Sequence, residues 1–323
     1  MQKESIAMII YAAFKLKPEH LAALKKAGHK LILPADFNLD AAAKTVDAIL
    51  GWDQNAQALI AGHNHVRWIQ TASAGVDYLP LTDLAAADIV VSNTSGIHAE
   101  PIAESVLASL LAFGRGFMNV RDRKPANFWP RSNVMAGMFT LADNKTAVIL
   151  GTGHIGQEIA RLLHAFGVHT LGISAHGRPA AHFDAVGTDA QTAGYLAQAD
   201  FVVNVMPLTP ATHHFLNADR FAQMHKQPLV VNVGRGPSLD TTALLAALDA
   251  GQVRGAALDV FEEEPLPANS PLYTDPRVLV TPHISGNVPH LRQEVFTIFA
   301  ANLAQFSQDG TLARNQVNLQ AGY

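Results

Sequence analysis

The chain alternates between short apolar runs and stretches with helical periodicity. Each run is rich in Ile, Val and Leu and is closed by small or glycine-containing turns. Runs of this kind are typical of parallel strands that helices cover on both faces. Short connections and right-handed crossovers then favour a doubly wound α/β fold. The expected strands lie in segments 6–13, 30–34, 46–52, 66–75, 88–96, 146–153, 168–174, 200–207, 228–236, 255–261 and 277–283.

A helical segment separates the runs into two groups, each of which predicts one parallel-sheet domain. Ile102, Val106 and Leu110 recur at helical spacing, and Pro101 suits a first helical turn. We therefore expect a long helix over 98–117 that crosses from the first domain to the second.

A final helix, expected over 288–307, should return to complete the first domain. The first domain then comprises 1–97 and 288–323, and the second, 98–287, is inserted within it. Segment 116–141 is expected to form an exposed arm directed toward a partner subunit. Its polar and bulky residues are Arg121, Arg123, Lys124, Pro125, Trp129 and Pro130.

The second domain begins with a glycine-rich phosphate loop. The strand ending at Leu150 runs directly into GTGHIG, which places Gly151, Gly153 and Gly156 before an amphipathic helix. In dinucleotide-binding proteins these glycines allow the tight turn, the approach of backbone amides to the pyrophosphate, and close helix–strand packing. The order predicts a Rossmann domain, with His154 and Ile155 also at the cofactor.

The next strand end bears on the choice of nucleotide. NAD enzymes usually place a carboxylate there to hold the ribose 2′-hydroxyl. This chain has Ser174, and its first carboxylate after that point is Asp184. Ser174, His176 and Arg178 could instead hold a 2′-phosphate, which Arg can bind bidentately. The pattern favours NADP over NAD, with a solvated loop as the alternative.

Composition excludes several classes of function. Charged residues make up 15% of the 323 residues and the net charge is −4. Nucleic-acid and anionic-membrane binders concentrate Lys and Arg, so neither partner is expected. The chain has no cysteine, which excludes thiolate catalysis and disulfides. We find neither a membrane span nor a clean signal-peptide cleavage site, and expect a soluble, cytoplasmic protein.

Three later segments follow predicted strands: NVGRGPSLD, ALDVFEEEPLP and TPHISG. They contain Arg235, Asp259, Glu264 and His283, at the sheet edge where open α/β sheets bind ligands. With GTGHIG, and in this order, they resemble the D-isomer-specific 2-hydroxyacid dehydrogenase family, which includes glyoxylate/hydroxypyruvate reductases and phosphoglycerate dehydrogenases. The resemblance covers essentially the whole chain. It implies a Rossmann domain inserted in a flavodoxin-like substrate domain.

Carried over by motif, the family's catalytic residues correspond to Arg235, Glu264 and His283; Glu262 and Glu263 do not match. The chemistry agrees with this, because reduction of a 2-keto acid needs a proton donor, and imidazole with a carboxylate partner is a natural one. Arg235 would clamp the substrate carboxylate. The resemblance implies further contacts: for the cofactor, Val205, Pro207, Thr212, Val233, Asp259 and Gly286; for the substrate, Ser73, Ala74, Gly75 and Val76.

The resulting hypothesis is an NAD(P)-dependent oxidoreductase that reduces a small 2-keto acid to a D-2-hydroxy acid. Its partners would be the small-molecule substrate and a second copy of the chain. Two alternatives remain: a phosphoglycerate dehydrogenase working in oxidation, and a nucleotide-sensing co-regulator of the same fold. The histidine pairs His63/His65 and His213/His214 lack the spacing and carboxylate company of a metal site, so no metal is expected.

Overall fold

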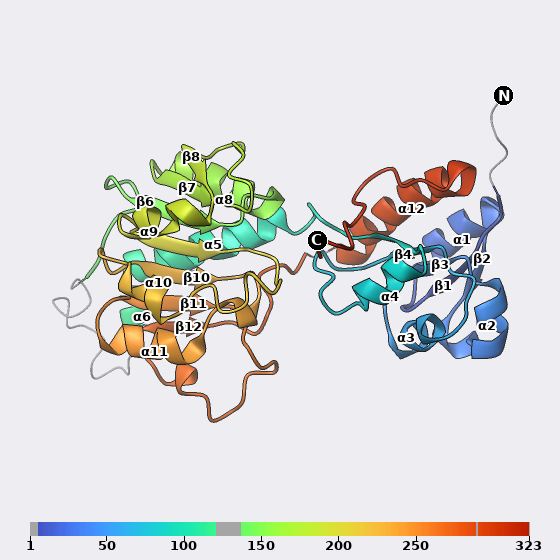
Figure 1. Cartoon of the computed structure of the whole chain (residues 1–323), viewed down its shortest axis with the longest axis horizontal. Coiled ribbons are helices and arrows are strands. Elements are labelled where there is room, and N and C mark those ends of the chain that lie inside the picture. Colours follow the sequence, from blue (N-terminus) through green and yellow to red (C-terminus); the bar gives the residue numbers. More distant parts are fainter. Residues whose placement is uncertain (1–5, 121–136, 289, 323) are drawn as a thin grey trace. The chain divides into compact units, whose positions relative to one another are not determined.

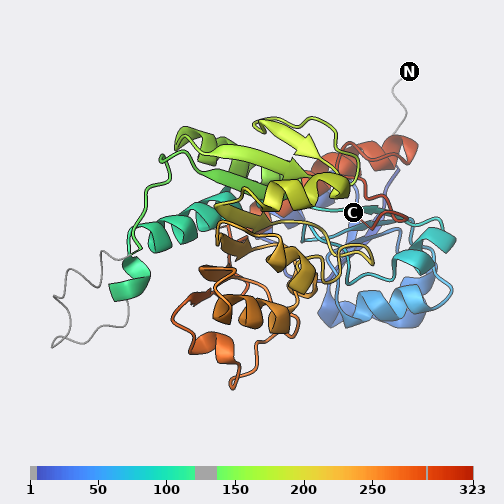
Figure 2. The same cartoon turned by 60° about the vertical axis from the view of Figure 1, so that its left-hand side comes forward.

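The computed structural model describes residues 6–120, 137–288 and 290–322. The middle of the predicted arm, 121–136, lies outside the described residues. The chain divides into two compact units, one formed by Met1–Ile97 with Val288–Tyr323 and the other by His98–Asn287. Figure 1 shows both units with labels on many of their helices and strands, and Figure 2 gives a second view of them.

The first unit contains a five-stranded parallel sheet of order β2-β1-β3-β4-β5, which is the flavodoxin-like order. The last helix of the chain packs on this sheet, and Phe299 stacks on the buried Trp68 with ring centroids 5.2 Å apart. That helix ends where Gly310 adopts φ +77, a left-handed conformation that glycine accepts readily. The elements are β1 (Ile9–Ala12), α1 (Pro18–Lys26), β2 (Lys30–Ile32), α2 (Leu39–Thr45), β3 (Ala48–Leu50), α3 (Gln54–Ala61), β4 (Trp68–Gln70), α4 (Leu81–Ala86), β5 (Val90–Ser92) and α12 (Leu291–Asp309).

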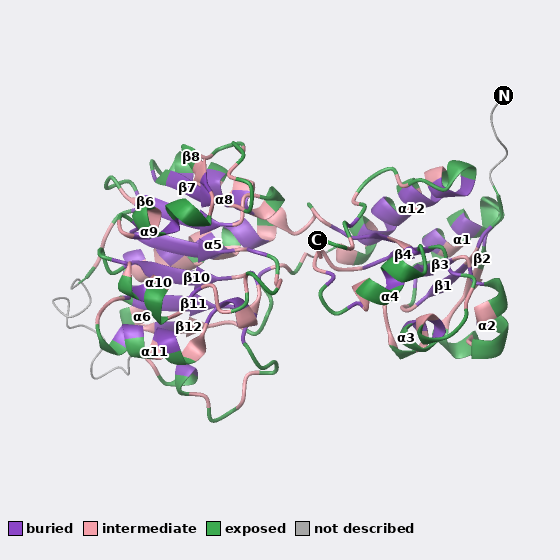
Figure 3. Ribbon diagram, viewed as in Figure 1, coloured by how far each residue is buried: buried purple, intermediate pink, exposed green. Residues whose placement is uncertain are grey.

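The second unit contains a seven-stranded parallel sheet of order β12-β11-β10-β9-β6-β7-β8. The chain order reverses between β6 and β9, the switch point at which doubly wound sheets bind nucleotides. Every residue of β6, β9, β10 and β11 is buried, as their apolar sequences require (Figure 3). The elements are α5 (Ala99–Gly114), α6 (Phe117–Val120), β6 (Thr146–Leu150), α8 (His154–Ala165), β7 (His169–Ile173), β8 (Ala185–Gly187), α9 (Thr192–Leu196), β9 (Phe201–Asn204), α10 (Ala218–Ala222), β10 (Leu229–Asn232), α11 (Thr241–Asp249), β11 (Gly255–Leu258) and β12 (Val278–Val280).

The structure confirms the predicted fold class of two doubly wound parallel sheets. It differs in detail from the expected elements. The helix expected over 98–117 is α5 followed by the separate short α6, with Gly116 at φ +72 between them. Strand β8 was not predicted, because its three residues, Ala-Val-Gly, form no apolar run. In the described parts of the chain, no helix has the length and apolar character needed to cross a membrane.

Candidate active site

The glycine loop after β6 forms an open cradle at the start of α8. Gly151 has φ +108, and a Cβ there would lie 3.0 Å from the carbonyl oxygen of Val205. A Cβ on Gly156 would lie 2.0 Å from the oxygen of Gly151, so neither position tolerates a side chain. Gly153 is the N-cap of α8; nothing lies within 4 Å of the Cβ position there, and no side chain caps the helix. These residues fit a diphosphate, which backbone amides at a helix N-terminus bind.

The loop after β7 carries the side chains predicted to select the nucleotide. Ser174 is half-buried, and its Oγ accepts a hydrogen bond from the backbone N of Gly177 at 3.2 Å. Gly177 adopts φ +61, which turns the chain tightly. His176 and Arg178 flank it and are exposed. The loop therefore offers a hydroxyl, an imidazole and a guanidinium where many NAD enzymes place a carboxylate.

Three adjacent strands bring the predicted chemistry to one edge of the sheet. Arg235 follows β10, Asp259 directly follows β11, and His283 lies three residues after β12. These strands are parallel neighbours, with Asn232 opposite Leu258 and Leu258 opposite Val280. Their carboxyl ends therefore lie side by side, as the sequence predicted.

His283 and Glu264 form a hydrogen-bonded pair. His283 Nδ1 lies 2.7 Å from Glu264 Oε2, and their side chains are 54% and 36% exposed. The other carboxylate oxygen of Glu264 accepts the backbone N–H of Phe261 at 3.0 Å. Both carboxylate oxygens are held, so the glutamate presents a fixed acceptor to the imidazole. His283 adopts φ +53, an uncommon conformation for a residue with a side chain and one found at functional sites.

Asp259 shapes the turn that carries His283. Its carboxylate is buried and accepts hydrogen bonds from Thr281 Oγ1 at 2.6 Å and from the backbone N–H groups of Ile284 and Ser285 at 3.0 and 2.9 Å. Its carbonyl oxygen accepts the N–H of His283 at 2.8 Å. Burial raises the pKa of Asp259, but the hydrogen bonds from the turn outweigh burial and place that pKa below its usual value. The carboxylate stays ionised and holds the turn.

A buried network that sequence reasoning missed holds the backbone at Arg235. The carbonyl oxygen of Arg235 accepts hydrogen bonds from Ser238 Oγ at 2.5 Å and Asn232 Nδ2 at 3.2 Å. Asn204 Nδ2 donates to Asn232 Oδ1 and to Ser238 Oγ, at 2.9 and 2.5 Å. A signal was present in the sequence, because the triplet Val-Val-Asn ends both β9 and β10. Two amides at neighbouring strand ends can reach each other.

The loop of Arg235 and the loop of Glu264 are in direct backbone contact. A Cβ added to Gly236 would lie 1.8 Å from the carbonyl oxygen of Phe261, so only glycine fits there. Arg235 Nη1 donates to the carbonyl of Gly234 at 2.9 Å. Gly236 thus allows the backbone of the Arg235 loop to lie directly against the backbone of the Glu264 loop.

A second His–Glu pair lies beside the first. His214 Nε2 lies 2.7 Å from Glu262 Oε1, and the other oxygen of Glu262 accepts the backbone N–H of Thr241 at 3.1 Å. Burial raises the pKa of Glu262, but these hydrogen bonds outweigh it and leave the pKa below its usual value. Glu262 therefore ties the 209–216 loop and the start of α11 to its own loop.

The other predicted cofactor contacts surround these loops. The carbonyl of Val205 backs the phosphate loop, and Pro207 is exposed. Thr212 Oγ1 donates to the carbonyl of Pro207 at 2.7 Å and stabilises its own loop. Val233 lines a hollow of about 330 Å³ that also includes Asp259. The carbonyl of Gly286 lies 2.8 Å from His98 Nδ1. Their contacts with a cofactor remain predictions.

The predicted substrate turn, 73–76, follows β4 in the other unit. Its carbonyl groups have partners inside that unit: Asn93 Nδ2 donates to the oxygen of Ala74 at 2.8 Å, and the N–H of Thr94 donates to that of Ser73 at 3.1 Å. Ser73 Oγ lies 2.8 Å from the hydroxyl of Tyr78. Its binding to a substrate also remains a prediction.

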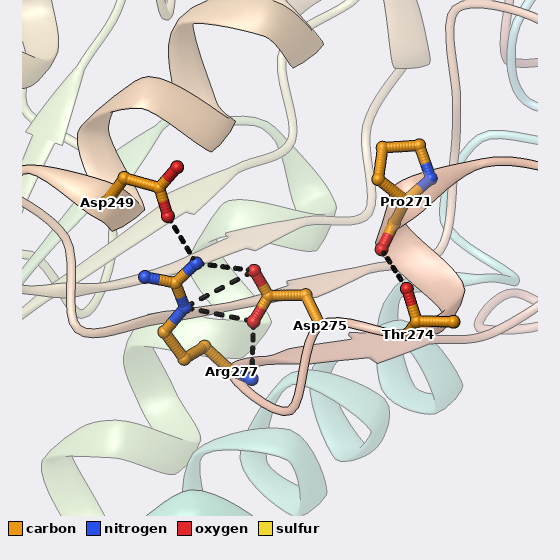
Figure 4. Close-up of polar contacts among 5 residues, drawn as sticks. All are labelled: Asp249, Pro271, Thr274, Asp275 and Arg277. Atoms are coloured by element: carbon orange, nitrogen blue, oxygen red, sulfur yellow. Dashed lines mark hydrogen bonds and ion pairs between the residues drawn. The ribbon is translucent and has the colours of Figure 1, made fainter.

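The opposite end of β12 carries charges that are bound to one another. The Arg277 guanidinium donates three hydrogen bonds to the carboxylate of Asp275, the shortest at 2.6 Å, and one to Asp249 at 2.7 Å (Figure 4). The guanidinium holds the pKa of Asp275 below its usual value. In the described ranges, no three His, Asp or Glu side chains gather as metal ligands would.

Comparison with known proteins agrees with this geometry. A family model described as "D-isomer specific 2-hydroxyacid dehydrogenase, NAD binding domain" matches residues 107–285, inside the second unit. The glyoxylate/hydroxypyruvate reductase B of Citrobacter koseri is 34% identical over 85% of this chain and 86% of its own length. The fold and the glycine loop define a nucleotide-binding α/β protein of two units. The chain belongs to the D-isomer specific 2-hydroxyacid dehydrogenase family of oxidoreductases, which confirms the resemblance.

Two solved structures cover nearly all of the chain. A phosphoglycerate dehydrogenase from Lactobacillus plantarum is 43% identical, covering 96% of this chain and 100% of its own, with a TM-score of 0.58. An NADPH-dependent glyoxylate/hydroxypyruvate reductase from Sinorhizobium meliloti, solved with NADP and malonate, is 26% identical, covering 97% of each chain, with a TM-score of 0.76.

Proposed function

We propose that the protein reduces small 2-keto acids to D-2-hydroxy acids with NADPH. The observation that carries this proposal is the 2.7 Å contact between His283 Nδ1 and Glu264 Oε2 at the edge of the nucleotide-binding sheet. The relatives support the reaction class, since the curated relative from Citrobacter koseri is named a glyoxylate/hydroxypyruvate reductase. The glycine cradle supports the nucleotide.

In the proposed mechanism His283 is the general acid. Glu264 binds Nδ1, which fixes the ring and stabilises the imidazolium, so Nε2 is the nitrogen that donates a proton to the keto oxygen. A nicotinamide nucleotide, when bound, would supply the hydride for the carbonyl carbon. Proton and hydride together convert the carbonyl to an alcohol. In the reverse direction His283 accepts the hydroxyl proton.

Arg235 is proposed to bind the substrate carboxylate, because a guanidinium matches a carboxylate bidentately and polarises the adjacent keto group. The buried amides of Asn204 and Asn232 support this role by fixing the backbone from which the side chain extends. The backbone amides of turn 73–76 are proposed as the second carboxylate contact. The carbonyl oxygens of Ala74 and Ser73 accept hydrogen bonds from Asn93 Nδ2 and the N–H of Thr94, and these bonds, which fix the turn, support the proposed contact.

We propose NADP as the preferred cofactor. Ser174, His176 and Arg178 at the end of β7 would hold the 2′-phosphate, and the Sinorhizobium meliloti relative was solved with NADP. Steady-state kcat/KM with NADPH and with NADH tests this. Arg178→Ala should lower kcat/KM for NADPH about 10- to 150-fold and leave that for NADH nearly unchanged, since one charge-assisted contact contributes roughly 1.5–3 kcal/mol. Equal loss with both nucleotides would contradict the assignment.

A phosphoglycerate dehydrogenase working in oxidation is a second candidate, because a structure of that name is 43% identical to this chain. Consumption of NADPH with glyoxylate, hydroxypyruvate and phenylpyruvate, compared with reduction of NADP or NAD by 3-phosphoglycerate, separates the two. Tight nucleotide binding without turnover in either direction would instead favour a nucleotide sensor.

We further propose that the protein works in the cytoplasm as a homodimer. The low charged fraction, 15%, leaves room for a buried contact between subunits, and the absence of cysteine is compatible with a reducing compartment. Sedimentation equilibrium of the purified chain tests the dimer: a single species of 34.5 kDa would contradict it.

A further inference from the structure

The turn after β4, residues 73–76, has a regular pattern of hydrogen bonds. Three successive carbonyl oxygens, those of Ser73, Ala74 and Gly75, each accept a hydrogen bond from a group of the same unit. The N–H groups of Ala74, Gly75 and Val76 have no hydrogen-bond partner among the described residues. The turn therefore presents three peptide groups whose oxygens are occupied and whose N–H groups are available to a ligand.

Each of these hydrogen bonds fixes the direction of one N–H group. A trans peptide group is planar, so its C=O and its N–H point in opposite directions. The oxygen of Ala74 and the N–H of Gly75 belong to one peptide group, so the donor that binds this oxygen also sets where the N–H points. The same hydrogen bond polarises the peptide group and makes its N–H a stronger donor. Successive N–H groups of this kind suit an anion.

Asn93 supplies the donor for the central peptide group. It directly follows β5, the parallel neighbour of β4, and it is 8% exposed. Its Nδ2 donates to the oxygen of Ala74 at 2.8 Å, and its Oδ1 accepts the N–H of Ser95 at 3.0 Å. Its carbonyl oxygen accepts a hydrogen bond from Nε2 of the buried Gln70 at 3.1 Å. Both the side chain and the backbone of Asn93 are therefore fixed, and Asn93 can in turn fix the orientation of the peptide group that it binds.

Two hydroxyl groups hold the peptide groups on either side. Thr71 Oγ1 donates to the oxygen of Ser73 at 2.8 Å, and Ser73 Oγ donates to the oxygen of Gly75 at 2.9 Å. A serine hydroxyl has one proton, so the Tyr78 hydroxyl, 2.8 Å from Ser73 Oγ, is the donor in that contact. The Tyr78 hydroxyl therefore orients the serine hydroxyl that binds the third peptide group.

We propose that Asn93 is a positioning residue, which directs the N–H of Gly75 at the carboxylate of the 2-keto acid. Tyr78, acting through Ser73, directs the N–H of Val76 at the same carboxylate. The inference rests on the proposed function, in which this turn binds the carboxylate, and adds the side chains that prepare the turn. Both side chains act through the backbone, so their loss should weaken recognition of the carboxylate more than reduction of the keto group.

The test compares kcat/KM for pyruvate and for methyl pyruvate, both measured with NADPH. The ester keeps the keto group but has no negative charge, so dividing the first value by the second cancels effects on folding and on cofactor binding. For the wild type we expect a ratio of at least about 10, because hydrogen bonds to charged groups are roughly twice as strong as neutral ones. Asn93→Ala should lower this ratio at least about tenfold, mainly through a higher KM for pyruvate.

The matched control is Asn302→Ala. Asn302 is also buried; its Nδ2 donates to Gln70 Oε1 at 3.1 Å, and its Oδ1 accepts the N–H of Arg314 at 3.0 Å. The control thus removes one donated and one accepted hydrogen bond, as Asn93→Ala does. Among the described residues, Asn302 makes no hydrogen bond to the turn. Its ratio should equal that of the wild type even if its stability falls.

Tyr78→Phe is a second test, and it decides the proposal if Asn93→Ala does not fold. Tyr78 is 48% exposed, so removal of its hydroxyl leaves the core intact. The ratio should fall about 2- to 10-fold, the net contribution of one hydrogen bond.

Wild-type ratios in both Asn93→Ala and Tyr78→Phe would overturn the positioning role, while turnover of pyruvate by the wild type would still support the proposed function. An equal loss in Asn302→Ala would also overturn the positioning role, since the effect would then come from general destabilisation. Failure of the wild type to oxidise NADPH with either pyruvate or glyoxylate would overturn the proposed function, and the positioning role with it.

Discussion

Two His–Glu pairs have their glutamates on one loop, the segment after β11, and their histidines on two different loops. The distance from imidazole nitrogen to carboxylate oxygen is 2.7 Å in both His283–Glu264 and His214–Glu262. The two glutamate side chains are each 36% exposed, and both histidines have positive φ, +53 and +48. A close His–Glu contact is therefore not enough to identify a catalytic acid.

The surroundings distinguish the two pairs. Glu264 and His283 line a cavity of about 790 Å³ beside edge strand β12, and Asp259 holds the turn of His283. The second carboxylate oxygen of Glu262 accepts a hydrogen bond from the N–H of Thr241, so Glu262 connects three backbone segments. We infer that position at the sheet edge, beside a space that a substrate can enter, separates the proposed acid from a structural pair.

The largest effect is expected when His283, the histidine of the proposed catalytic pair, is replaced. His283→Ala should lower kcat by roughly 10²- to 10⁴-fold, the usual contribution of a positioned general acid. The measurement is NADPH oxidation at saturating 2-keto acid. His214→Ala is the matched control, because it removes an imidazole–carboxylate contact of the same length from Glu262, two residues before Glu264.

If both alanine variants lose activity to the same extent, the distinction drawn between the pairs is wrong. If neither loses activity, His283 is not the acid. Glu264→Gln sharpens the result, since it keeps the shape of the side chain while removing the charge that stabilises the imidazolium.

Substitution of Asp259 is expected to have the next largest effect, and it should change the stability of the protein as well as kcat. Asp259→Asn replaces an ionised acceptor of buried hydrogen bonds, which should lower the free energy of unfolding by about 1–3 kcal/mol at pH 7. The turn of His283 should loosen, so kcat should fall too. Urea unfolding measures the stability. Asp249→Asn is the control, because that carboxylate is 76% exposed and its ion pair with Arg277 should contribute less than about 1 kcal/mol.

The pH dependence of this effect has a definite sign. The pKa of Asp259 is lower in the folded protein than its usual value, so its stabilisation is fully present above that usual value, near 4. It is lost as the pH falls through the lowered pKa. The difference in unfolding free energy between wild type and Asp259→Asn should therefore shrink in acid. A difference that grows as the pH falls would contradict the assignment.

The sequence was sufficient for features that depend on spacing after a strand. Gly151 and Arg235 follow buried strands at fixed intervals, so their place at the sheet edge could be predicted. The Asn204–Asn232 network could not, because it depends on which side chains meet across neighbouring strands. The cavity beside His283 has the same origin, since its walls come from segments that converge only in three dimensions.

The smallest effect is expected at Glu262 and tests the structural side of the comparison. Glu262→Gln should lower the free energy of unfolding by about 0.2–1 kcal/mol at pH 7, as for a partly exposed ion pair. Because the pKa of Glu262 is lowered by folding, this contribution is present above its ordinary value and disappears as the pH falls through the lowered one. The kcat should stay close to that of wild type, because Glu262 is not among the described residues that line the cavity beside His283. A hundredfold loss of kcat, with stability unchanged, would show that Glu262 takes part in the reaction. Position at the sheet edge would then not distinguish the two His–Glu pairs.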